Sequence, residues 1–378
     1  MSLPEQNKKF LAEIITLYYS KRPLKEPSFL PKREIAIQPI GAKSYIRHLA
    51  FPSIIRLYEY IKSKPPLHLY YSSAIYENPS AESMDTKTWL GSELLFDIDA
   101  DHYPGCSDAI NICSNCGSIV EASDKCPKCS SEDIVKIPLL KPGCFIMAWN
   151  DALKIIDIME HEFGAKQIEV VFSGHRGFHI KISDKHLFYL DRDERRAIID
   201  YLMLKDIMIE KIIPPIGRKK NRALFLKERE YGLRARLRDI ALKTLNIKDL
   251  GLVIEVDYDA LRKILELTKV EIDPVVTMDI TRLSRFINSI NGKAGLYVCR
   301  MDPDEDFKPD LTRFEVFRGK ILVKSLVDLP EITILGKNIS LKKGEKKYID
   351  ATLAFYLGVK GLVEIINIKD IEVIKPRN

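Results

Sequence analysis

Two closely spaced pairs of cysteines constrain the fold of this chain more than any other feature of its sequence. Cys113 and Cys116 form one Cys-x-x-Cys pair, and Cys126 and Cys129 form a second pair after nine intervening residues. Each spacing lets two thiolates and nearby backbone amides wrap one tetrahedral Zn²⁺. A site of four thiolates leaves no position for water, so we expect this zinc to be structural.

Three further cysteines lie outside the two pairs. Five of the 7 cysteines fall between Cys106 and Cys129, and we expect no secretory signal, because no apolar stretch follows the first charged residues. Such clustering in a reducing compartment indicates metal ligation rather than disulfides. Cys106 is a possible substitute zinc ligand, and His102 is a weaker one. We expect Cys144 and Cys299 to be core or incidental residues.

Composition excludes several classes of protein. The 378 residues are 46% apolar and 30% charged, which predicts two or three folded units rather than a disordered chain. No run approaches the ~20 apolar residues that are needed to span a bilayer. We therefore expect a soluble, cytoplasmic protein with no membrane partner.

Positive charge is concentrated in residues 217–238. This window holds nine basic residues against Glu228 and Glu230, whereas the whole chain has a net charge of only +6. A concentrated positive field suits a polyanionic partner such as a nucleic acid. A solvated helical face with ion pairs is the alternative interpretation.

The pattern of apolar residues predicts an α+β fold with a mixed sheet and two insertions. Short strand-like runs alternate with helix-like runs up to the cysteine cluster, a helix follows it, and strand patterns return near the end of the chain. We expect strands over 93–99, 167–172, 178–182, 275–278, 332–339 and 362–373, and helices over 6–19, 52–63 and 145–163. The expected units are a core of 1–105, 135–185 and 270–378, a zinc-binding insertion of 106–134 and a helical insertion of 186–269.

Two carboxylates share one face of an expected strand. In Leu-Leu-Phe-Asp-Ile-Asp, residues 94–99, the alternation places Asp97 and Asp99 side by side, opposite the apolar residues. Two such carboxylates repel each other unless a cation lies between them, and hard oxygen ligands suit Mg²⁺ or Mn²⁺. A pair of solvated carboxylates at a strand end is the alternative.

A glycine-rich turn follows in Ser-Gly-His-Arg-Gly-Phe-His, residues 173–179. Its two glycines would let backbone amides approach an anion, while Ser173 and Arg176 could bind phosphate oxygens. His179 should point away from the apolar face of the second strand. The alternative is a tight hairpin with a solvated Arg and His.

These motifs resemble those of the archaeal and eukaryotic DNA primases, in the small catalytic subunit. Phe-Asp-Ile-Asp-Ala-Asp, Ser-Gly-His-Arg-Gly-Phe-His and a third segment over 275–296 occur in the order of the three motifs of that family. The resemblance implies the primase-polymerase fold, a mixed-sheet core with a zinc-binding and a helical subdomain.

The resemblance also implies site residues. Asp97, Asp99 and Asp279 would carry two catalytic Mg²⁺ or Mn²⁺ ions. The nucleoside triphosphate would be bound by Ser173, Arg176, His179, Asn291 and Lys293. The third motif departs from the family pattern, because Ile287 replaces a usual proline and Asn291 a usual histidine. We expect Asp279 at the start of a helix that presents Arg282 and Arg285 on one face.

The implied activity is de novo synthesis of short primers on single-stranded DNA for replication, by two-metal nucleotidyl transfer. Its partners would be the template, nucleoside triphosphates and a large subunit that carries an iron–sulfur cluster, within the replication machinery at the nucleoid. Three alternatives remain open. They are a non-catalytic zinc-ribbon module that binds nucleic acid or protein, a two-metal nuclease, and a primase-polymerase used in repair.

Overall fold

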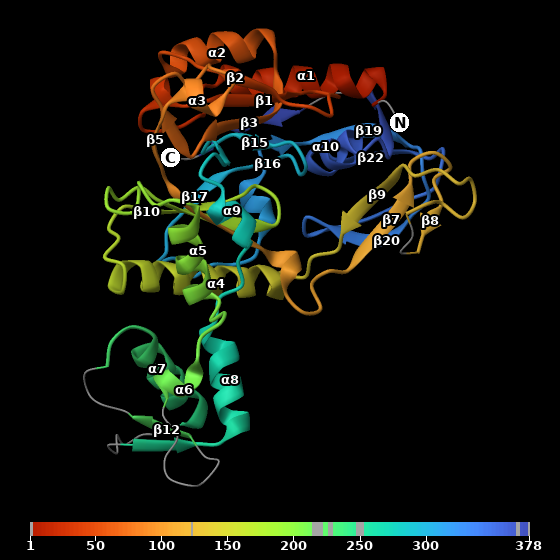
Figure 1. Cartoon of the computed structure of the whole chain (residues 1–378). Coiled ribbons are helices and arrows are strands. Elements are labelled where there is room, and N and C mark those ends of the chain that lie inside the picture. Colours follow the sequence, from red (N-terminus) through yellow and green to blue (C-terminus); the bar gives the residue numbers. More distant parts are fainter. Residues whose placement is uncertain are drawn as a thin grey trace.

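Two antiparallel four-stranded sheets form the centre of the fold (Figure 1). The computed structural model describes residues 3–121, 124–213, 222–225, 230–246, 253–367 and 371–376. The first sheet has the order β14-β3-β1-β2, and the second has the order β17-β10-β11-β6. Their bounds are Ile35–Pro39 (β1), Ile46–Leu49 (β2), Pro66–Ser72 (β3), Leu94–Asp99 (β6), Ile168–Phe172 (β10), Gly177–Ile182 (β11), Leu283–Arg285 (β14) and Cys299–Met301 (β17).

Strand β6 follows the predicted alternation. Leu94, Phe96 and Ile98 are at most 1% exposed and belong to the main hydrophobic core. Helix α4 (Pro142–His161) packs against β6 and β11 on the apolar face, where the rings of Trp149 and Phe178 lie 5.2 Å apart. The opposite face is therefore left free for polar groups.

Helices α1 (Glu5–Ser20) and α2 (Ile54–Ser63) pack against each other, and α1 contacts β3 of the first sheet (Figure 1). Both were predicted from the sequence, and Ser53 caps α2 by accepting a hydrogen bond from the Arg56 N–H. Short elements connect the two sheets: β4 (Ala74–Tyr76), α3 (Met84–Lys87) and β5 (Trp89–Ser92). No described helix combines the length and the apolar character that crossing a bilayer requires.

The paired cysteines belong to a small three-stranded sheet of order β8-β7-β9, with bounds Ala109–Cys113 (β7), Ile119–Val120 (β8) and Ile134–Pro138 (β9). Cys113 ends β7, and the other three lie in the connections between the strands. This sheet packs on the C-terminal part of the chain, since Lys343 Nζ donates to the Cys116 carbonyl over 3.1 Å. The C-terminal elements are Phe317–Arg318 (β18), Lys320–Ser325 (β19), Leu329–Ile334 (β20), Lys337–Leu341 (β21), Lys346–Asp350 (β22), Ala351–Val359 (α10), Val363–Asn367 (β23) and Glu372–Val373 (β24).

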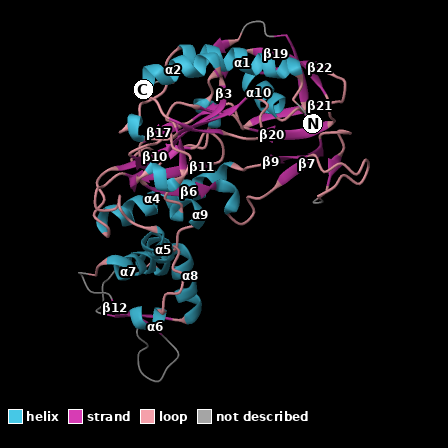
Figure 2. Ribbon diagram, turned by 45° about the horizontal axis from the view of Figure 1, so that its top comes forward, coloured by secondary structure: helices cyan, strands magenta, loops and turns pink. Residues whose placement is uncertain are grey.

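Residues 204–265 have a hydrophobic cluster of their own, which includes Leu237 and Ile264, whereas Ile198 and Leu202 pack into the main core. The described part of residues 186–269 extends away from the two sheets, beyond α4 (Figure 2). Their helices are Arg192–Leu202 (α5), Ile209–Ile212 (α6), Gly232–Leu245 (α7) and Tyr258–Thr268 (α8). An antiparallel pair, β12 (Arg222–Phe225) and β13 (Val253–Val256), was not predicted from the sequence. Residues 217–221 and 226–229 of the basic segment 217–238 lie outside the described residues.

The third motif corrects two predictions. Residues 275–278, predicted as a strand, belong to helix α9 (Pro274–Met278). The Asp273 carboxylate caps α9 by accepting from the Val275 N–H, and a proline in the first turn favours the helix. Arg285, predicted on a helix face, instead ends strand β14, because residues 283–285 pair with β3.

Candidate active site

A polar cleft of about 370 Å³ opens on the face of β6 and β11 that α4 leaves free. Strand β14 and the turn between β15 (Ile290–Asn291) and β16 (Leu296–Tyr297) complete its walls. The charged and polar residues that line it are Tyr45, Tyr70, Asp97, Asp99, Ser173, His175, Arg176, His179, Asp273, Arg282, Arg285, Asn291 and Lys293. The cleft thus gathers all the predicted catalytic and nucleotide-binding residues except Asp279.

Asp97 and Asp99 lie at one end of β6, and Asp97 pairs in register with His179 of β11. Burial, and then the negative charge of Asp99, raise the pKa of Asp97 to about 7. Its Oδ1 atom is buried and has no hydrogen-bond partner among the described residues, although His179 Nε2 lies 3.4 Å away. A buried oxygen without a partner beside a second carboxylate fits a divalent cation.

The third carboxylate of the cleft is Asp273 rather than Asp279. The charge of Asp273 contributes to the raised pKa of Asp97. Asp279 ends α9, and its Oδ1 accepts hydrogen bonds from the backbone N–H and the hydroxyl of Thr281, at 2.9 and 2.7 Å. The segment read from the sequence, 275–296, contained Asp279 and not Asp273, which lies just before it and precedes the start of α9 at Pro274.

The glycine turn has the conformation that its sequence requires. Gly174 has φ +72°, and a Cβ at Gly177 would lie 2.1 Å from the Ile98 carbonyl oxygen. Ser173 Oγ accepts a hydrogen bond from the Gly177 N–H over 3.2 Å. Asn291 Nδ2 donates to the Ser173 carbonyl over 2.8 Å, so this residue joins the turn to the third motif.

Cations face the carboxylates across the cleft. Arg176 forms ion pairs with Asp99 at 2.9 Å and with Asp101 at 2.8 Å. Burial, followed by the charges of Arg285 and Arg176, lowers the pKa of the Lys293 ammonium. Such mutual repulsion is relieved when an anion binds.

Two histidines at the cleft or beside it were not among the predicted site residues. His175 is in the turn and lines the cleft; burial and then the charge of Arg176 lower its pKa. His68 on β3 is 3% exposed, and its Nδ1 accepts from Arg285 Nη1 at 2.9 Å and from the Gly292 N–H at 3.2 Å. His68 has no motif around it, so only its tertiary contacts identify it.

The four paired cysteines converge as predicted. Their sulfur atoms lie within 4.8 Å of one another, with 3.5 Å between Cys113 and Cys129 and 3.6 Å between Cys116 and Cys126. Four sulfurs at Zn–S distances of about 2.3 Å around a tetrahedral ion would be about 3.8 Å apart. The four thiols therefore fit a zinc ion.

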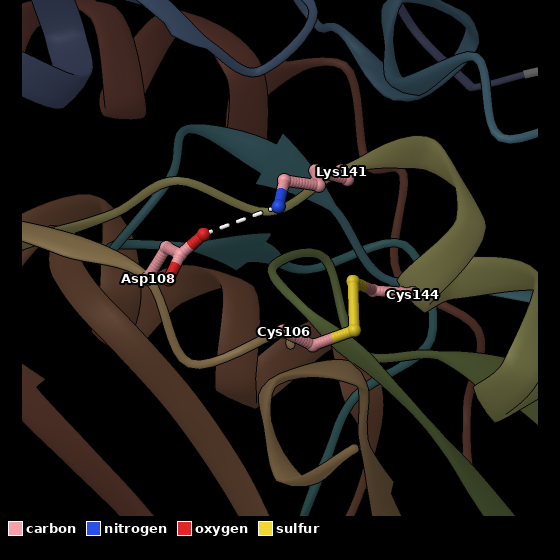
Figure 3. The surroundings of a disulfide bond; sticks show 4 residues. All are labelled: Cys106, Asp108, Lys141 and Cys144. Carbon is pink, nitrogen blue, oxygen red and sulfur yellow. Dashed lines mark hydrogen bonds and ion pairs between the residues drawn. A yellow bond between two sulfur atoms is a disulfide. The ribbon is translucent and has the colours of Figure 1, made fainter. Parts of the chain in front are cut away.

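Cys106 is not a zinc ligand. It forms a disulfide with Cys144, the third residue of α4, although no disulfide was predicted (Figure 3). An ion pair between Asp108 and Lys141, 3.2 Å apart, lies beside this bond. The disulfide and the ion pair both join the start of the cysteine-rich segment to the start of α4.

Most residues of the cleft and all four paired cysteines lie in a region of the chain that matches a known protein family. A sequence model of the DNA primase small subunit family matches residues 96–301, which include the cleft carboxylates, the zinc cysteines, the glycine turn and the third motif. The chain belongs to the DNA primase small subunit family. The resemblance seen in the order of the three motifs is thereby confirmed.

Relatives extend the similarity to nearly the whole chain. The DNA primase small subunit PriS of Staphylothermus marinus is 44% identical over 363 residues, which cover 96% of each chain. That of Aeropyrum pernix is 33% identical over 345 residues, covering 91% of this chain and 90% of the relative. That of Saccharolobus solfataricus is 32% identical and covers 92% of each.

Proposed function

We propose that this protein is the catalytic subunit of a DNA primase that makes short primers de novo on single-stranded DNA by two-metal nucleotidyl transfer. One observation carries the proposal: Asp97, with its buried oxygen lacking a partner, lies beside Asp99 and faces Arg176 and Lys293 across one cleft. A group of carboxylates opposite a group of cations suits metal ions that bridge to a triphosphate.

Asp97 and Asp99 would hold the catalytic Mg²⁺ or Mn²⁺ ions, and we propose Asp273 in the place first expected for Asp279. When bound, such ions lower the pKa of a primer 3′-hydroxyl and stabilise the leaving pyrophosphate. The pKa of Asp97 is raised to about 7. Below that pH its carboxyl group is mostly protonated and must lose the proton before it can bind a cation.

The other cleft residues would bind and orient the nucleotide. Lys293 and Arg176 would neutralise the triphosphate, and Ser173 and the glycine turn would offer hydrogen-bond donors. His179, whose pKa burial lowers to about 3, stays neutral beside Asp97. Asn291 would act by holding the Ser173 carbonyl, which gives the residue a positioning role without positive charge.

The remaining predictions belong to the same proposal. The cysteine-rich sheet would hold a structural Zn²⁺, and residues 106–134 and 186–269 would be insertions into a primase-polymerase core. A template strand would bind to a basic groove without sequence preference, and the partner would be the large primase subunit. The protein would act at the nucleoid, in the cytoplasm.

Unprimed synthesis tests the proposal. The protein is incubated with single-stranded DNA, labelled nucleoside triphosphates and Mg²⁺ or Mn²⁺, with and without a large subunit. We expect oligonucleotides from the wild type and none from an Asp97→Ala, Asp99→Ala double variant. If the template were shortened instead, a nuclease would be indicated. No product under any condition would favour a zinc-ribbon binding module.

A further inference from the structure

Asp151 is a buried carboxylate of helix α4 that lies outside the three motifs. The residue is only 6% exposed, and it is not among the residues that line the cleft. A buried carboxylate is costly unless hydrogen bonds or a cation satisfy its oxygens. The partners of Asp151 therefore show which parts of the fold this side chain holds together.

The Oδ2 atom of Asp151 accepts two hydrogen bonds from parts of the chain that are far apart in sequence. The Tyr103 hydroxyl donates one over 2.8 Å, and the Glu271 backbone N–H donates the other over 3.0 Å. Burial, and then the charge of Asp151, raise the pKa of the Tyr103 hydroxyl, so this group stays protonated and donates. Tyr103 follows the short 3₁₀ helix Ala100–His102 at the end of β6. One oxygen thus links the chain just after β6 to the chain just before Asp273.

A second residue of α4 supports the same contact. Lys154 Nζ donates to Asp151 Oδ1 over 2.9 Å and to the backbone carbonyl of Lys269 over 3.3 Å. Between Lys269 and Glu271, the Val270 N–H donates to the Leu202 carbonyl over 3.1 Å. The backbone of 269–271 is therefore held by α4 through two side chains and by the end of α5 through a backbone bond.

This backbone leads directly to the third carboxylate of the cleft. Residues 269–273 connect α8 to α9 without forming a helix or a strand, and Figure 1 shows the chain passing α4 on its way. Two residues after Glu271, the Asp273 N–H donates to the Asp97 carbonyl over 3.0 Å. A segment without regular structure has no helical or strand ladder to fix its course, so its bonds to neighbouring groups do so.

A metal site depends on such support. Ligands must be held close to the positions that the ion requires, and hydrogen bonds to the residues behind them fix these positions and tune the affinity. Asp151 reaches both sides of the proposed site in this way, through Tyr103 beyond β6 and through Glu271 before Asp273.

We propose that Asp151 is a positioning residue for the catalytic metal site, because its hydrogen bonds with Glu271 and Tyr103 hold Asp273 in the same cleft as Asp97 and Asp99. The inference rests on the proposed function, in which these three carboxylates bind Mg²⁺ or Mn²⁺. Helix α4 would thus contribute to metal binding from the apolar face of the sheet.

Titration of the full chain with Mn²⁺ tests this role, with free Mn²⁺ measured by electron paramagnetic resonance and no nucleotide or template present. The Asp97→Ala, Asp99→Ala double variant gives the binding that does not involve the cleft. We expect Asp151→Ala to weaken the affinity for Mn²⁺ about tenfold. Asp151→Asn should retain most of the affinity, because its Oδ1 can accept the same two hydrogen bonds and only the bond from Lys154 is lost. Tyr103→Phe should cause a smaller loss, and it tests the inference even if Asp151→Ala does not fold.

Asp184→Ala is the matched control. Asp184 is 7% exposed and also accepts backbone hydrogen bonds, from the N–H groups of Lys166 and Gln167 at 2.8–3.0 Å. It follows the end of β11 that is distant from Asp99, so its loss should destabilise the fold and leave the affinity for Mn²⁺ unchanged. Equal losses of affinity in Asp151→Ala and Asp184→Ala would overturn the inference.

Three further results would overturn it. One is wild-type affinity for Mn²⁺ in both Asp151→Ala and Tyr103→Phe. Another is a loss in Asp151→Asn as large as that in Asp151→Ala, which would separate the effect from the two hydrogen bonds. The third concerns Asp273→Asn, in which Asp151→Ala should cause a much smaller further loss, because its effect passes through Asp273. An undiminished loss in that background would show that Asp151 acts elsewhere.

The proposed function fails separately, because Mn²⁺ binding is measured without synthesis. If the expected losses of affinity were found and the wild type made no primers, the Asp151 inference would stand and primase activity would be rejected. A wild type that makes primers while Asp151→Ala and Tyr103→Phe bind Mn²⁺ normally would reverse that result. If the Asp97→Ala, Asp99→Ala variant bound Mn²⁺ as the wild type does, both the metal site and the role of Asp151 would be overturned.

Discussion

The backbone N–H of Asp273 donates a hydrogen bond to the backbone carbonyl of Asp97 over 3.0 Å. This bond joins the start of α9 to the strand that bears the two cleft carboxylates, and the Asp273 side chain enters the same cleft. Asp279 is only six residues further along the chain, yet its carboxylate is occupied by Thr281. The carboxylates of Asp273 and Asp279 therefore lie in different surroundings, and only that of Asp273 lines the cleft.

Asp273→Asn should abolish most primer synthesis, and Asp279→Asn should not. Asparagine can still cap α9, so the loss would report the missing charge at the metal site rather than an unfolded helix. We expect a decrease in kcat of roughly a hundredfold or more, as for other losses of charge stabilisation in a transition state. The inverse pattern, with Asp279→Asn inactive and Asp273→Asn active, would restore the assignment made from the sequence.

Removal of zinc should unfold the loops that carry the four cysteines. Among the described residues, the hydrophobic cluster around the thiols has only Cys113, Val120 and Cys126 as buried members, whereas Ile112 of β7 and Ile137 of β9 pack into the main core. Elemental analysis should find about one zinc per chain, and the Cys113→Ser, Cys116→Ser variant should lose the metal and become sensitive to protease in this segment. Cys299→Ser is the control. A stably folded wild type without zinc would contradict this prediction.

The Cys106–Cys144 disulfide should stabilise the protein without affecting the zinc. It joins residues that are 38 positions apart, and cross-links of such loops contribute about 2–4 kcal/mol to the free energy of unfolding. The Cys106→Ser, Cys144→Ser variant should unfold at lower denaturant concentration and retain its full zinc content. Loss of zinc in this variant would show instead that Cys106 is a ligand.

Local patterns in the sequence were sufficient for much of the site. The alternation along 94–99 indicated which face bears Asp97 and Asp99, and the two cysteine spacings indicated one four-sulfur cluster. Both signals are complete within a few residues. The strand, the glycine turn and the cysteine cluster could be predicted because each forms from residues that lie close together in the sequence.

Contacts between distant residues could not be predicted in this way. Cys106 meets Cys144 only because the start of α4 passes beside the cysteine-rich segment, and Phe355 lies under Gly295 only because α10 packs beneath the β15–β16 turn. The apolar run 275–278 suits a strand, and a capping aspartate with a proline in the first turn makes it a helix. In each case tertiary packing or capping outweighs the local pattern.

Gly177→Ala should distort the active site. The added Cβ would lie 2.1 Å from the backbone carbonyl of Ile98 and 2.8 Å from Asp99 Oδ1, so β6 and β11 would have to separate where the carboxylates lie. We expect a loss of about 1–3 kcal/mol in the free energy of unfolding, together with a large loss of primer synthesis. Gly143→Ala in the first turn of α4 is the control, because nothing lies within 4 Å of its Cβ and alanine favours a helix. Equal stability in the two variants would contradict the clash.

His68 should make the folded protein sensitive to acid. Burial, followed by the charge of Arg285, lowers its pKa in the folded state to about 2, whereas an unfolded histidine has a pKa of about 6.5. Below pH 6.5 the unfolded chain binds a proton that the folded chain excludes, so the free energy of unfolding falls as the pH falls, by up to about 1.4 kcal/mol per pH unit for this residue.

Denaturant unfolding at pH 7, 6 and 5 should therefore show a steeper decline in stability for the wild type than for His68→Asn, whose side chain can accept the Arg285 hydrogen bond but does not titrate. His161→Asn removes an exposed histidine whose pKa is raised by the Asp157 carbonyl and carboxylate, so this variant should decline at least as steeply as the wild type. Parallel declines of the wild type and His68→Asn would mean that His68 becomes protonated in the folded protein, and the bond from Arg285 to its Nδ1 could then not persist.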